Sequence, residues 1–197
     1  MHEPATPPNI GVLAIQGDYE RHADALQKSG ALPSLVKTPE ALENLDALIL
    51  PGGESTTMLR FLERNSFFDF LKSFAQKKPV FGTCAGAILL ARDVQNPTQR
   101  SLAILDIAVE LNAYGVQRDS AILTLETEIP GGPLETVFIR APRIISAGPD
   151  VEVLAKRDGF PVLICQGYTM AATFHPELSE DRRVHQHFVN LVNNARN

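Results

Sequence analysis

The sequence predicts a single α/β domain in which helices cover both faces of a sheet, giving three layers. In the first half of the chain, short apolar segments alternate with segments of helical periodicity, a pattern typical of a parallel sheet between helices. In the second half, strand-like segments follow one another closely, which predicts largely antiparallel strands and hairpins. A chain of 197 residues is long enough to bury a sizeable core in one domain.

The N-terminal half supplies the alternating pattern. A Pro-rich segment at residues 1–9 is expected to be a disordered tail, and the domain, residues 10–197, begins with the buried strand IGVLAI. We expect a helix after this strand, with Asp18 as its N-cap and Gly30 at its end. Further strands are expected at 32–36, 46–51 and 79–82, with two helices before the last of these, the second at 67–76, and one after it at 85–92.

The C-terminal half reads as a succession of strands followed by one helix. Turn residues at Gly131 and Asp158 separate some of these strands. The last helix is expected to take Ser179 as its N-cap. Its apolar face comprises Val184, Phe188, Leu191 and Val192. The expected strands are 106–111, 121–129, 135–142, 151–156, 161–166 and 169–174.

The composition excludes several classes of function. A formal net charge of −5, with no run of Lys or Arg, gives the chain no electrostatic attraction for nucleic acid or an anionic membrane. No apolar segment approaches the roughly 20 residues that cross a bilayer, and the N-terminus lacks the features of a signal peptide. Because Cys84 and Cys165 are the only cysteines, we expect a reducing, cytoplasmic environment. The cysteines and histidines lack the spacing of a zinc site, so no metal is expected.

One cysteine lies where a strand is expected to turn into a helix. In FGTCAG, Gly82 precedes Cys84 by two residues and Gly86 follows it by two. Such a corner strains the backbone of the central residue and leaves no room for side chains two residues away. The helix N-terminus favours a thiolate, and the N–H of Ala85 is placed to donate to an oxyanion. Cys84 is therefore a candidate nucleophile, although the same short pattern fits a small buried cysteine at a tight turn.

A nucleophilic thiol needs a base, and His175 is the strongest candidate. It follows an apolar strand in TFHPEL, where Pro176 favours an extended conformation for the residue before it. In an extended chain Glu177 projects to the same side, where a carboxylate can orient the imidazole as in a catalytic triad. A solvated pair at a strand end is the alternative. Surface or structural positions are expected for the other histidines, His2, His22, His185 and His187.

A glycine-rich loop, PGGEST at residues 51–56, is the third candidate element. It follows a buried strand, and Gly52 and Gly53 let its backbone approach a ligand closely. Open α/β sheets bind ligands beyond the carboxyl ends of their strands, so this loop is expected beside Cys84. A turn followed by an ordinary Ser or Thr helix cap is the alternative.

With these three motifs in this order, the chain resembles the triad (class I) glutamine amidotransferases. The segments FGTCAG, LPGGES and FHPE carry this resemblance. A more specific similarity is to the family of glutaminase subunits of two-component pyridoxal 5′-phosphate synthases. It rests on GVLAIQGDYERH, LPGGESTTM, FGTCAGAILLA, VFIRAP and ATFHPEL, and it extends from about Ile10 to the C-terminus.

The resemblance implies a flavodoxin-like α/β/α fold with a central mixed sheet and an enzyme that hydrolyses L-glutamine to L-glutamate and ammonia. Cys84 would be the nucleophile, His175 the general acid and base, and Glu177 the group that orients the imidazole. No cofactor or metal is required. The oxyanion would be held by backbone N–H groups of Gly52, Gly53 and Ala85. The residues that would contact glutamine are Gly53, Glu54, Ser55, Ile139 and Arg140.

The resemblance also implies a partner. Ammonia would pass to a separate (β/α)8-barrel synthase subunit, which builds pyridoxal 5′-phosphate from a pentose phosphate and a triose phosphate, in a complex of twelve copies of each subunit. The alternatives are a glutaminase subunit that serves another ammonia acceptor, a cysteine peptidase or hydrolase of similar fold, and a non-enzymatic binding protein. The motifs GGESTTM and FIRAP argue against another acceptor, and the complete Cys, His and Glu set argues against a binding protein.

Two further positions carry expectations. After the glutamate of DIAVEL the family commonly has arginine, whereas this chain has Leu111. A backbone contact to glutamine would survive this change, but a guanidinium–carboxylate pair would not. Arg118 in VQRDS matches another family arginine. Cys165 lies in an apolar strand and is expected to be an inert core thiol.

Overall fold

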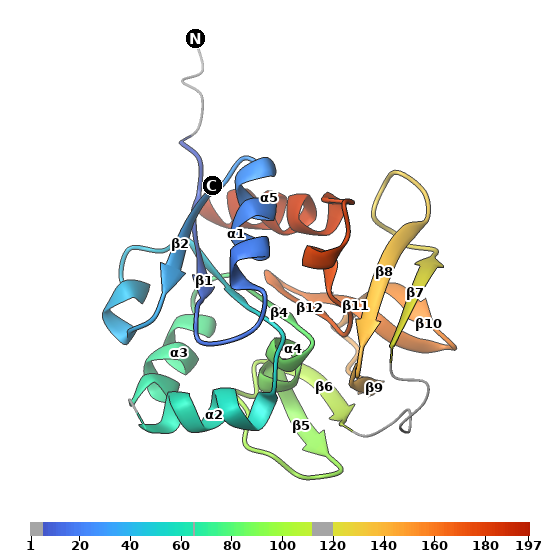
Figure 1. Cartoon of the computed structure of the whole chain (residues 1–197), viewed down its shortest axis with the longest axis horizontal. Coiled ribbons are helices and arrows are strands. Elements are labelled where there is room, and N and C mark those ends of the chain that lie inside the picture. The colour runs from blue at the N-terminus through green and yellow to red at the C-terminus, as the bar shows by residue number, and fades with distance from the viewer. Residues whose placement is uncertain (1–5, 65, 112–119) are drawn as a thin grey trace.

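Apolar segments form a seven-stranded mixed sheet at the centre of the protein (Figure 1). The computed structural model describes residues 6–64, 66–111 and 120–197. In spatial order the strands are β10 (Glu152–Arg157), β11 (Phe160–Gln166), β12 (Thr169–Ala172), β4 (Val80–Thr83), β3 (Ala47–Leu50), β1 (Asn9–Leu13) and β2 (Leu32–Val36). Neighbours from β12 to β2 pair in parallel, whereas β10, β11 and β12 pair antiparallel. The expected central mixed sheet is confirmed.

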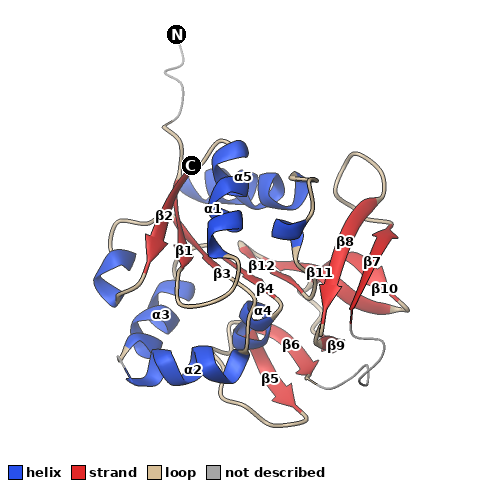
Figure 2. Ribbon diagram, in the orientation of Figure 1, coloured by secondary structure: helices blue, strands red, loops and turns tan. Residues whose placement is uncertain are grey.

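Helices cover both faces of this sheet, as Figure 2 shows. On one face lie α1 (Tyr19–Lys28) and α5 (Arg183–Arg196), and on the other lie α2 (Ser55–Arg64), α3 (Phe67–Ala75) and α4 (Ala85–Leu90). Two short 3-10 helices are η1 (Pro39–Leu42) and η2 (Pro176–Leu178). None of the helices in the described ranges combines the length and apolarity needed to cross a membrane. The three expected layers are therefore present.

Burial on both sides explains the continuous apolar strands. In β1, Ile10 and Val12 pack in the core beneath α1 and α5, whereas Leu13 packs in the core beneath α2, α3 and α4. The side chains of β3 alternate in the same way, with Ile49 in the first core and Leu50 in the second. Since successive residues of a strand point to opposite faces, a central strand needs apolar side chains at every position.

Five more strands form two smaller sheets. One contains β5 (Ala91–Gln95), β6 (Leu105–Glu110) and β9 (Arg143–Ala147), and the other is an antiparallel hairpin of β7 (Ser120–Leu125) and β8 (Leu134–Ile139). Strand β5 corrects the expectation of a helix over residues 85–92, because α4 ends at Leu90. Ala91 has an extended backbone and pairs with Leu105 of β6. This tertiary pairing overrides the local helical pattern.

The start of the described chain is attached to the end of the last helix. The carbonyl oxygen of Thr6 accepts a hydrogen bond of 2.9 Å from the guanidinium of Arg196. Strand β1 begins at Asn9, one residue before the expected boundary at Ile10. The first part of the expected tail, residues 1–5, lies outside the described residues.

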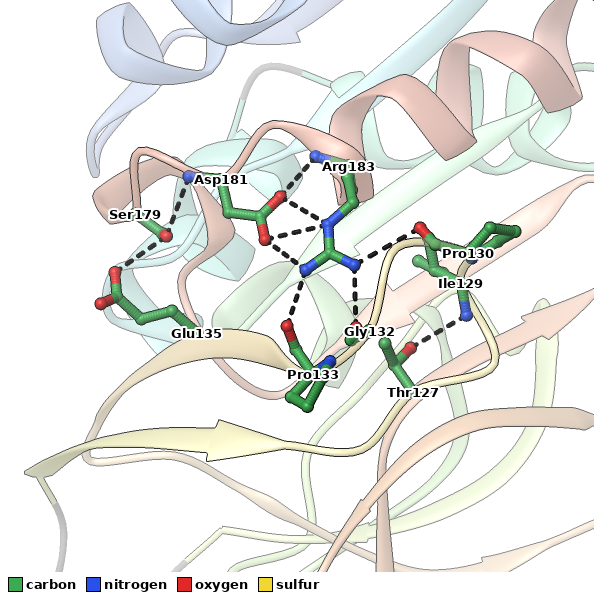
Figure 3. Close-up of polar contacts among 9 residues, drawn as sticks. All are labelled: Thr127, Ile129, Pro130, Gly132, Pro133, Glu135, Ser179, Asp181 and Arg183. Carbon is green, nitrogen blue, oxygen red and sulfur yellow. Dashed lines mark hydrogen bonds and ion pairs between the residues drawn. The ribbon is translucent and has the colours of Figure 1, made fainter.

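Polar contacts hold the segment before α5 (Figure 3). The expectation that Ser179 is the N-cap is wrong, because the helix begins at Arg183 and the Ser179 hydroxyl binds elsewhere. That hydroxyl accepts the N–H of Asp181 (3.1 Å) and donates to the carboxylate of Glu135 (2.9 Å). Arg183 pairs with Asp181 (2.6 Å) and donates to the carbonyl oxygen of Gly132 (2.8 Å). These contacts tie the β7–β8 hairpin to the start of α5.

The corner between β4 and α4 depends on two glycines. Helix α4 packs so closely on β3 that a Cβ at Gly86 would collide with the carbonyl oxygen of Leu50. A Cβ at Gly82 would lie 2.5 Å from the carbonyl carbon of Gly86 and 2.8 Å from the nitrogen of Ala87. Backbone atoms cannot move aside as the end of a flexible side chain can. Both positions therefore require glycine, as the spacing around the cysteine predicts.

We expect the substitution Gly86→Ala to destabilise the protein, although alanine is the better helix former by about 1 kcal/mol. The added methyl group overlaps the backbone of β3, so the free energy of unfolding should fall by about 3 kcal/mol or more. Urea denaturation measures this change. Gly132→Ala is the control, because its new Cβ meets no atom within 4 Å and only the positive φ opposes it, at about 1–2 kcal/mol. Equal stability of Gly86→Ala and wild type would disprove the packing argument.

Candidate active site

Cys84 lies at the β4–α4 corner with a strained backbone. Its φ of 48° and ψ of −104° are unusual for a residue that has a Cβ. Two backbone hydrogen bonds hold this conformation: the N–H donates to the carbonyl oxygen of Ala172 (2.8 Å), and the carbonyl oxygen accepts the N–H of Ile88 (3.2 Å). The residue is 6% exposed. The corner therefore fixes the thiol in one place at the N-terminus of α4.

His175 follows β12 and is positioned from two sides. Its backbone N–H donates to the carbonyl oxygen of Val137 in β8 (2.8 Å), and its ring Nδ1 lies 2.8 Å from Oε1 of Glu177. Glu177 is buried and belongs to η2, which Pro176 begins. The expected contact between imidazole and carboxylate is thus present, but the two side chains meet across a 3-10 turn rather than along an extended strand.

The thiol, the imidazole and the glycine-rich loop meet at one point. The side chain of Cys84 lies close enough to His175 to raise the pKa of the imidazole. Gly52 packs against both, since a Cβ there would lie 2.5 Å from Cε1 of His175 and 3.3 Å from Cβ of Cys84. Three segments far apart in the sequence therefore converge at the carboxyl ends of β3, β4 and β12. This is the edge of the sheet where the sequence predicts a ligand site.

The electrostatics of this cluster favour a charged imidazole. Burial lowers the pKa of His175, but the hydrogen bonds and charges of Cys84 and Glu177 outweigh burial and raise that pKa to about 10. Burial raises the pKa of Glu177, whereas His22 and His175 together hold it below its usual value. At neutral pH the cluster therefore contains an imidazolium beside an ionised carboxylate.

The glycine-rich loop is supported by the segment that follows β1. Gly53 has a φ of 131°, which residues with a side chain rarely adopt. A Cβ there would lie 2.7 Å from Nε2 of Gln16. The same amide nitrogen donates to the carbonyl oxygen of Glu54 (2.6 Å). The orientation of the loop backbone therefore depends on the Gln16 side chain.

The two residues after the glycines are engaged in local contacts. The carboxylate of Glu54 accepts the N–H groups of Thr56 (3.0 Å) and Thr57 (2.8 Å) and so caps α2. Hydrogen bonds from the hydroxyl groups of Thr56 and Thr57 lower the pKa of Glu54 to about 2. The Ser55 hydroxyl donates to Oε1 of Gln99 (2.8 Å). The Glu54 carboxylate thus has a structural task at the start of the helix.

Ile139 and Arg140 lie at the end of β8 and directly after it. Both are exposed, and Arg140 has a left-handed backbone with a φ of 43°. The same strand receives the backbone hydrogen bond of His175 at Val137, two residues before Ile139. Leu111, at the position where the resemblance implies an arginine, packs its side chain against the core beneath α2, α3 and α4. Arg118 lies outside the described residues.

Outside this cluster the described residues contain a second thiol, that of Cys165. The described residues contain no group of three or more His, Cys, Asp or Glu that could bind a metal ion. Cys165 lies in β11, where its Sγ donates to the carbonyl oxygen of Gly167 (3.3 Å). Burial, with a smaller effect of Glu152, raises the pKa of this thiol to about 11. A thiol in this environment is protonated and poorly reactive.

The structure places His22, to which the sequence analysis gave no site role, beside Glu177. His22 is fully buried in α1, and its Nε2 lies 3.3 Å from Oε2 of Glu177. Its Nδ1 lies 3.0 Å from Nε2 of His185. Helical spacing is the pattern that could have indicated this burial, because His22, Ala25 and Leu26 share the buried face of α1.

Comparisons with known proteins identify the family of this chain. The model of the SNO glutamine amidotransferase family matches residues 12–194. A protein of Koribacter versatilis named pyridoxal 5′-phosphate synthase subunit PdxT is 54% identical over 186 residues, which cover 94% of this chain and 96% of that protein. A protein of the same name from Thermotoga neapolitana is 48% identical and covers 93% of this chain and 98% of its own length.

Solved structures are similar over the same range. A crystal structure of a glutamine amidotransferase has a TM-score of 0.87 and 43% identity, covering 93% of this chain and 98% of that chain. The structure of PurLQS from Thermotoga maritima has a TM-score of 0.68 at 17% identity over 97% of this chain and 100% of that one, which indicates a shared fold alone. The expected glutamine amidotransferase fold is confirmed, and the chain belongs to the SNO glutamine amidotransferase family.

Proposed function

We propose that this chain hydrolyses L-glutamine to L-glutamate and ammonia, and that it delivers the ammonia to a synthase subunit that makes pyridoxal 5′-phosphate. The observation that carries the proposal is the convergence of Cys84, His175 and Glu177 at a strand–helix corner, where the imidazole contacts the carboxylate at 2.8 Å and lies beside the same glycine as the thiol. The relatives named pyridoxal 5′-phosphate synthase subunit PdxT support the choice of pathway.

The proposed reaction begins with attack of the Cys84 thiolate on the side-chain amide carbon of glutamine. The backbone N–H groups of Ala85 and of Gly52 and Gly53 hold the oxyanion of the tetrahedral intermediate. His175 then gives a proton to the departing nitrogen, which leaves as ammonia. Water attacks the resulting γ-glutamyl thioester, and the imidazole accepts its proton, which releases glutamate and restores the thiolate and imidazolium.

The environment of His175 suits both roles. While Cys84 is a thiolate, its charge and that of Glu177 keep the imidazole protonated and ready to act as an acid. Once the sulfur is bonded to the amide carbon it carries no charge, so one of the two influences that raise the pKa of His175 is lost. The imidazolium can then give its proton to the departing nitrogen, and the neutral imidazole that remains can take the proton of the attacking water. Glu177 remains ionised throughout and keeps the ring oriented.

We propose that glutamine contacts Gly53, Glu54, Ser55, Ile139 and Arg140. The Glu54 carboxylate caps α2 and its carbonyl oxygen binds Gln16, so a contact from Glu54 would use its backbone N–H. Ammonia would pass to a (β/α)8-barrel synthase subunit in a complex of twelve copies of each subunit, as the family resemblance implies. Glutaminase assays with and without that subunit test the proposal as a whole. They also separate it from a peptidase, which needs no partner.

We expect Cys84→Ala to abolish glutamine hydrolysis and leave the fold intact, because the β4–α4 corner accommodates small residues. Glutamate release measures the activity. Cys165→Ala is the matched control and should retain activity, since that thiol lies in β11 with a raised pKa. A glutamine analogue that alkylates thiols should label Cys84 and spare Cys165. Labelling of Cys165 first would show that the nucleophile is misassigned.

We expect Glu177→Gln to lower turnover by on the order of 100-fold, because an amide stabilises the imidazolium less than a carboxylate does. The pKa of His175 should fall below about 10, as followed by NMR of the imidazole. Protonated His175 stabilises the fold fully below pH 6.5, and this contribution is lost as the pH rises through about 10. In Glu177→Gln the loss should therefore occur at lower pH.

A matched control for that substitution is Glu180→Gln, three residues further along the chain. The Glu180 side chain is almost fully exposed, so neither turnover nor the pKa of His175 should change. If Glu177→Gln keeps full activity in the presence of the synthase subunit, Glu177 does not orient the base.

We expect the synthase subunit to raise the hydrolysis rate, by about 10-fold if one tenth of the free subunit is competent. Glycine peptides reorient easily, so docking at this sheet edge can select the loop conformation whose N–H faces the oxyanion. Glutamate release titrated with the synthase subunit measures the effect. Gln16→Ala should weaken the stimulation, because Gln16 holds the loop at Glu54. Gln27→Ala on the exposed face of α1 serves as the control. A rate that is already maximal without the partner would contradict this gating.

A further inference from the structure

A line of buried polar side chains continues from Glu177 into the helices on one face of the sheet. Oε1 of Glu177 binds Nδ1 of His175 (2.8 Å), and Oε2 lies 3.3 Å from Nε2 of His22 in α1. Nδ1 of His22 in turn lies 3.0 Å from Nε2 of His185 in α5. His22 and His185 are both 0% exposed. Bulk water therefore does not compete for these contacts, and the line connects both helices to the proposed catalytic imidazole.

His22 is the polar neighbour of a carboxylate oxygen that otherwise lacks one. In the part of the chain that the structure describes, Oε2 of Glu177 has no well-aligned hydrogen-bond donor, and its 3.3 Å contact with the His22 ring is an ion–dipole contact. A buried carboxylate oxygen without such a neighbour is energetically costly. The same Nε2 atom lies 3.3 Å from the hydroxyl of Thr83, the residue before Cys84.

One set of tautomers directs a ring N–H from His185 toward His22 and from His22 toward Glu177. Burial lowers the pKa of both His22 and His185, so both rings are neutral and each carries one N–H. An ionised carboxylate can only accept, so the tautomer that serves Glu177 has the His22 proton on Nε2, the atom that also lies 3.3 Å from the Thr83 hydroxyl. Nδ1 of His22 then accepts the Nε2–H of His185. Nδ1 of His185 has no partner among the described residues. In this tautomer that atom carries a lone pair and no proton, so it is not an unsatisfied buried donor.

We propose that His22 is a positioning residue of the glutaminase site: its Nε2–H holds Oε2 of Glu177, so that Oε1 stays ionised and directed at His175. His185 fixes the tautomer of His22 from the far side. The inference rests on the proposed function, because it assigns His22 to the same reaction. Since His22 acts through Glu177 and not through the glycine-rich loop, its loss should lower kcat and leave KM nearly unchanged.

Loss of the donor also changes the pH dependence. Burial raises the pKa of Glu177, and a neutral His22 ring with its N–H 3.3 Å from Oε2 favours the ionised carboxylate through its dipole. Without the ring N–H the carboxyl group keeps its proton to higher pH, so the acidic limb of the activity profile should move to higher pH. Several charged and titratable groups face one another along the line. His22 and His175 act on Glu177, and Cys84 and Glu177 act on His175. Glu177, His175 and Asp18 act on His22, and His22 and Arg182 act on His185.

The test compares His22→Leu with His22→Gln in the complex with the synthase subunit. Leucine fills much of the space but offers no donor, whereas the glutamine amide can donate to Oε2. We expect His22→Leu to lower kcat by about 10- to 100-fold, the range typical when a residue that orients a functional group is removed. The acidic limb should move to higher pH. His22→Gln should recover most of kcat and return the acidic limb towards wild type.

His187→Leu is the matched control, since His187 lies on α5, is half-buried and is not part of the line. It should leave kcat and the pH profile unchanged. Thermal unfolding of each variant separates a positioning role from a purely structural one. If His22→Leu keeps wild-type kcat and an unshifted acidic limb, or if His22→Gln loses as much activity as His22→Leu at equal stability, the proposal is wrong.

A second readout needs no activity and no variant. Nitrogen NMR of the histidine rings in the wild-type protein should show the proton of His22 on Nε2 and the proton of His185 on Nε2. A proton on Nδ1 of His22, or a charged His22 ring at neutral pH, would overturn the proposal. If the complex fails to hydrolyse glutamine while the tautomers are as expected, the proposed function fails and the buried contact to Glu177 stands.

Discussion

The close approach of α4 to β3 is the constraint on which the site depends. Because Gly86 has no Cβ, α4 can pack directly against the carbonyl oxygen of Leu50. The helix can therefore begin immediately after β4. The short corner obliges Cys84 to adopt a positive φ, which backbone bonds to Ala172 and Ile88 maintain. The chain continues from Leu50 through Pro51 to Gly52, which packs against both Cys84 and His175. One backbone contact thus brings the nucleophile and the glycine-rich loop together.

The position of the base depends on a different part of the molecule. Strand β8 lies outside the central sheet, yet the carbonyl oxygen of Val137 fixes the backbone of His175. The hairpin that contains β8 is anchored to the start of α5 by Arg183 and through the contact of Ser179 with Glu135. In Figure 3, the guanidinium of Arg183 donates to backbone carbonyl oxygens of the hairpin loop, those of Pro130, Gly132 and Pro133. The C-terminal strands therefore position the His175 imidazole beside the β4–α4 corner, which the N-terminal half forms.

The buried carboxylate of the site is tolerated because each of its oxygens faces a polar neighbour. Glu177 is almost fully buried, and an isolated carboxylate in that place would take up a proton. His175 contacts one of its oxygens and His22 the other. His175 in turn lies between Glu177 and Cys84, whose charges keep it protonated despite its burial. Removal of any one partner leaves a charge in a poorly solvated place, so the electrostatic roles of these residues depend on one another.

Local patterns in the sequence predicted the features of the protein that depend on residues close together in the chain. Continuous apolar strands indicated a sheet buried on both faces. The spacing of Gly82, Cys84 and Gly86 indicated a strained corner, and Gly30 does end α1 with a positive φ. The tertiary structure alone decided that Ala91 leaves the helix to pair with β6 and that His22 faces the carboxylate of Glu177. The physical reason is that a strained turn or an apolar run is specified by residues a few positions apart, whereas these contacts depend on how distant segments pack.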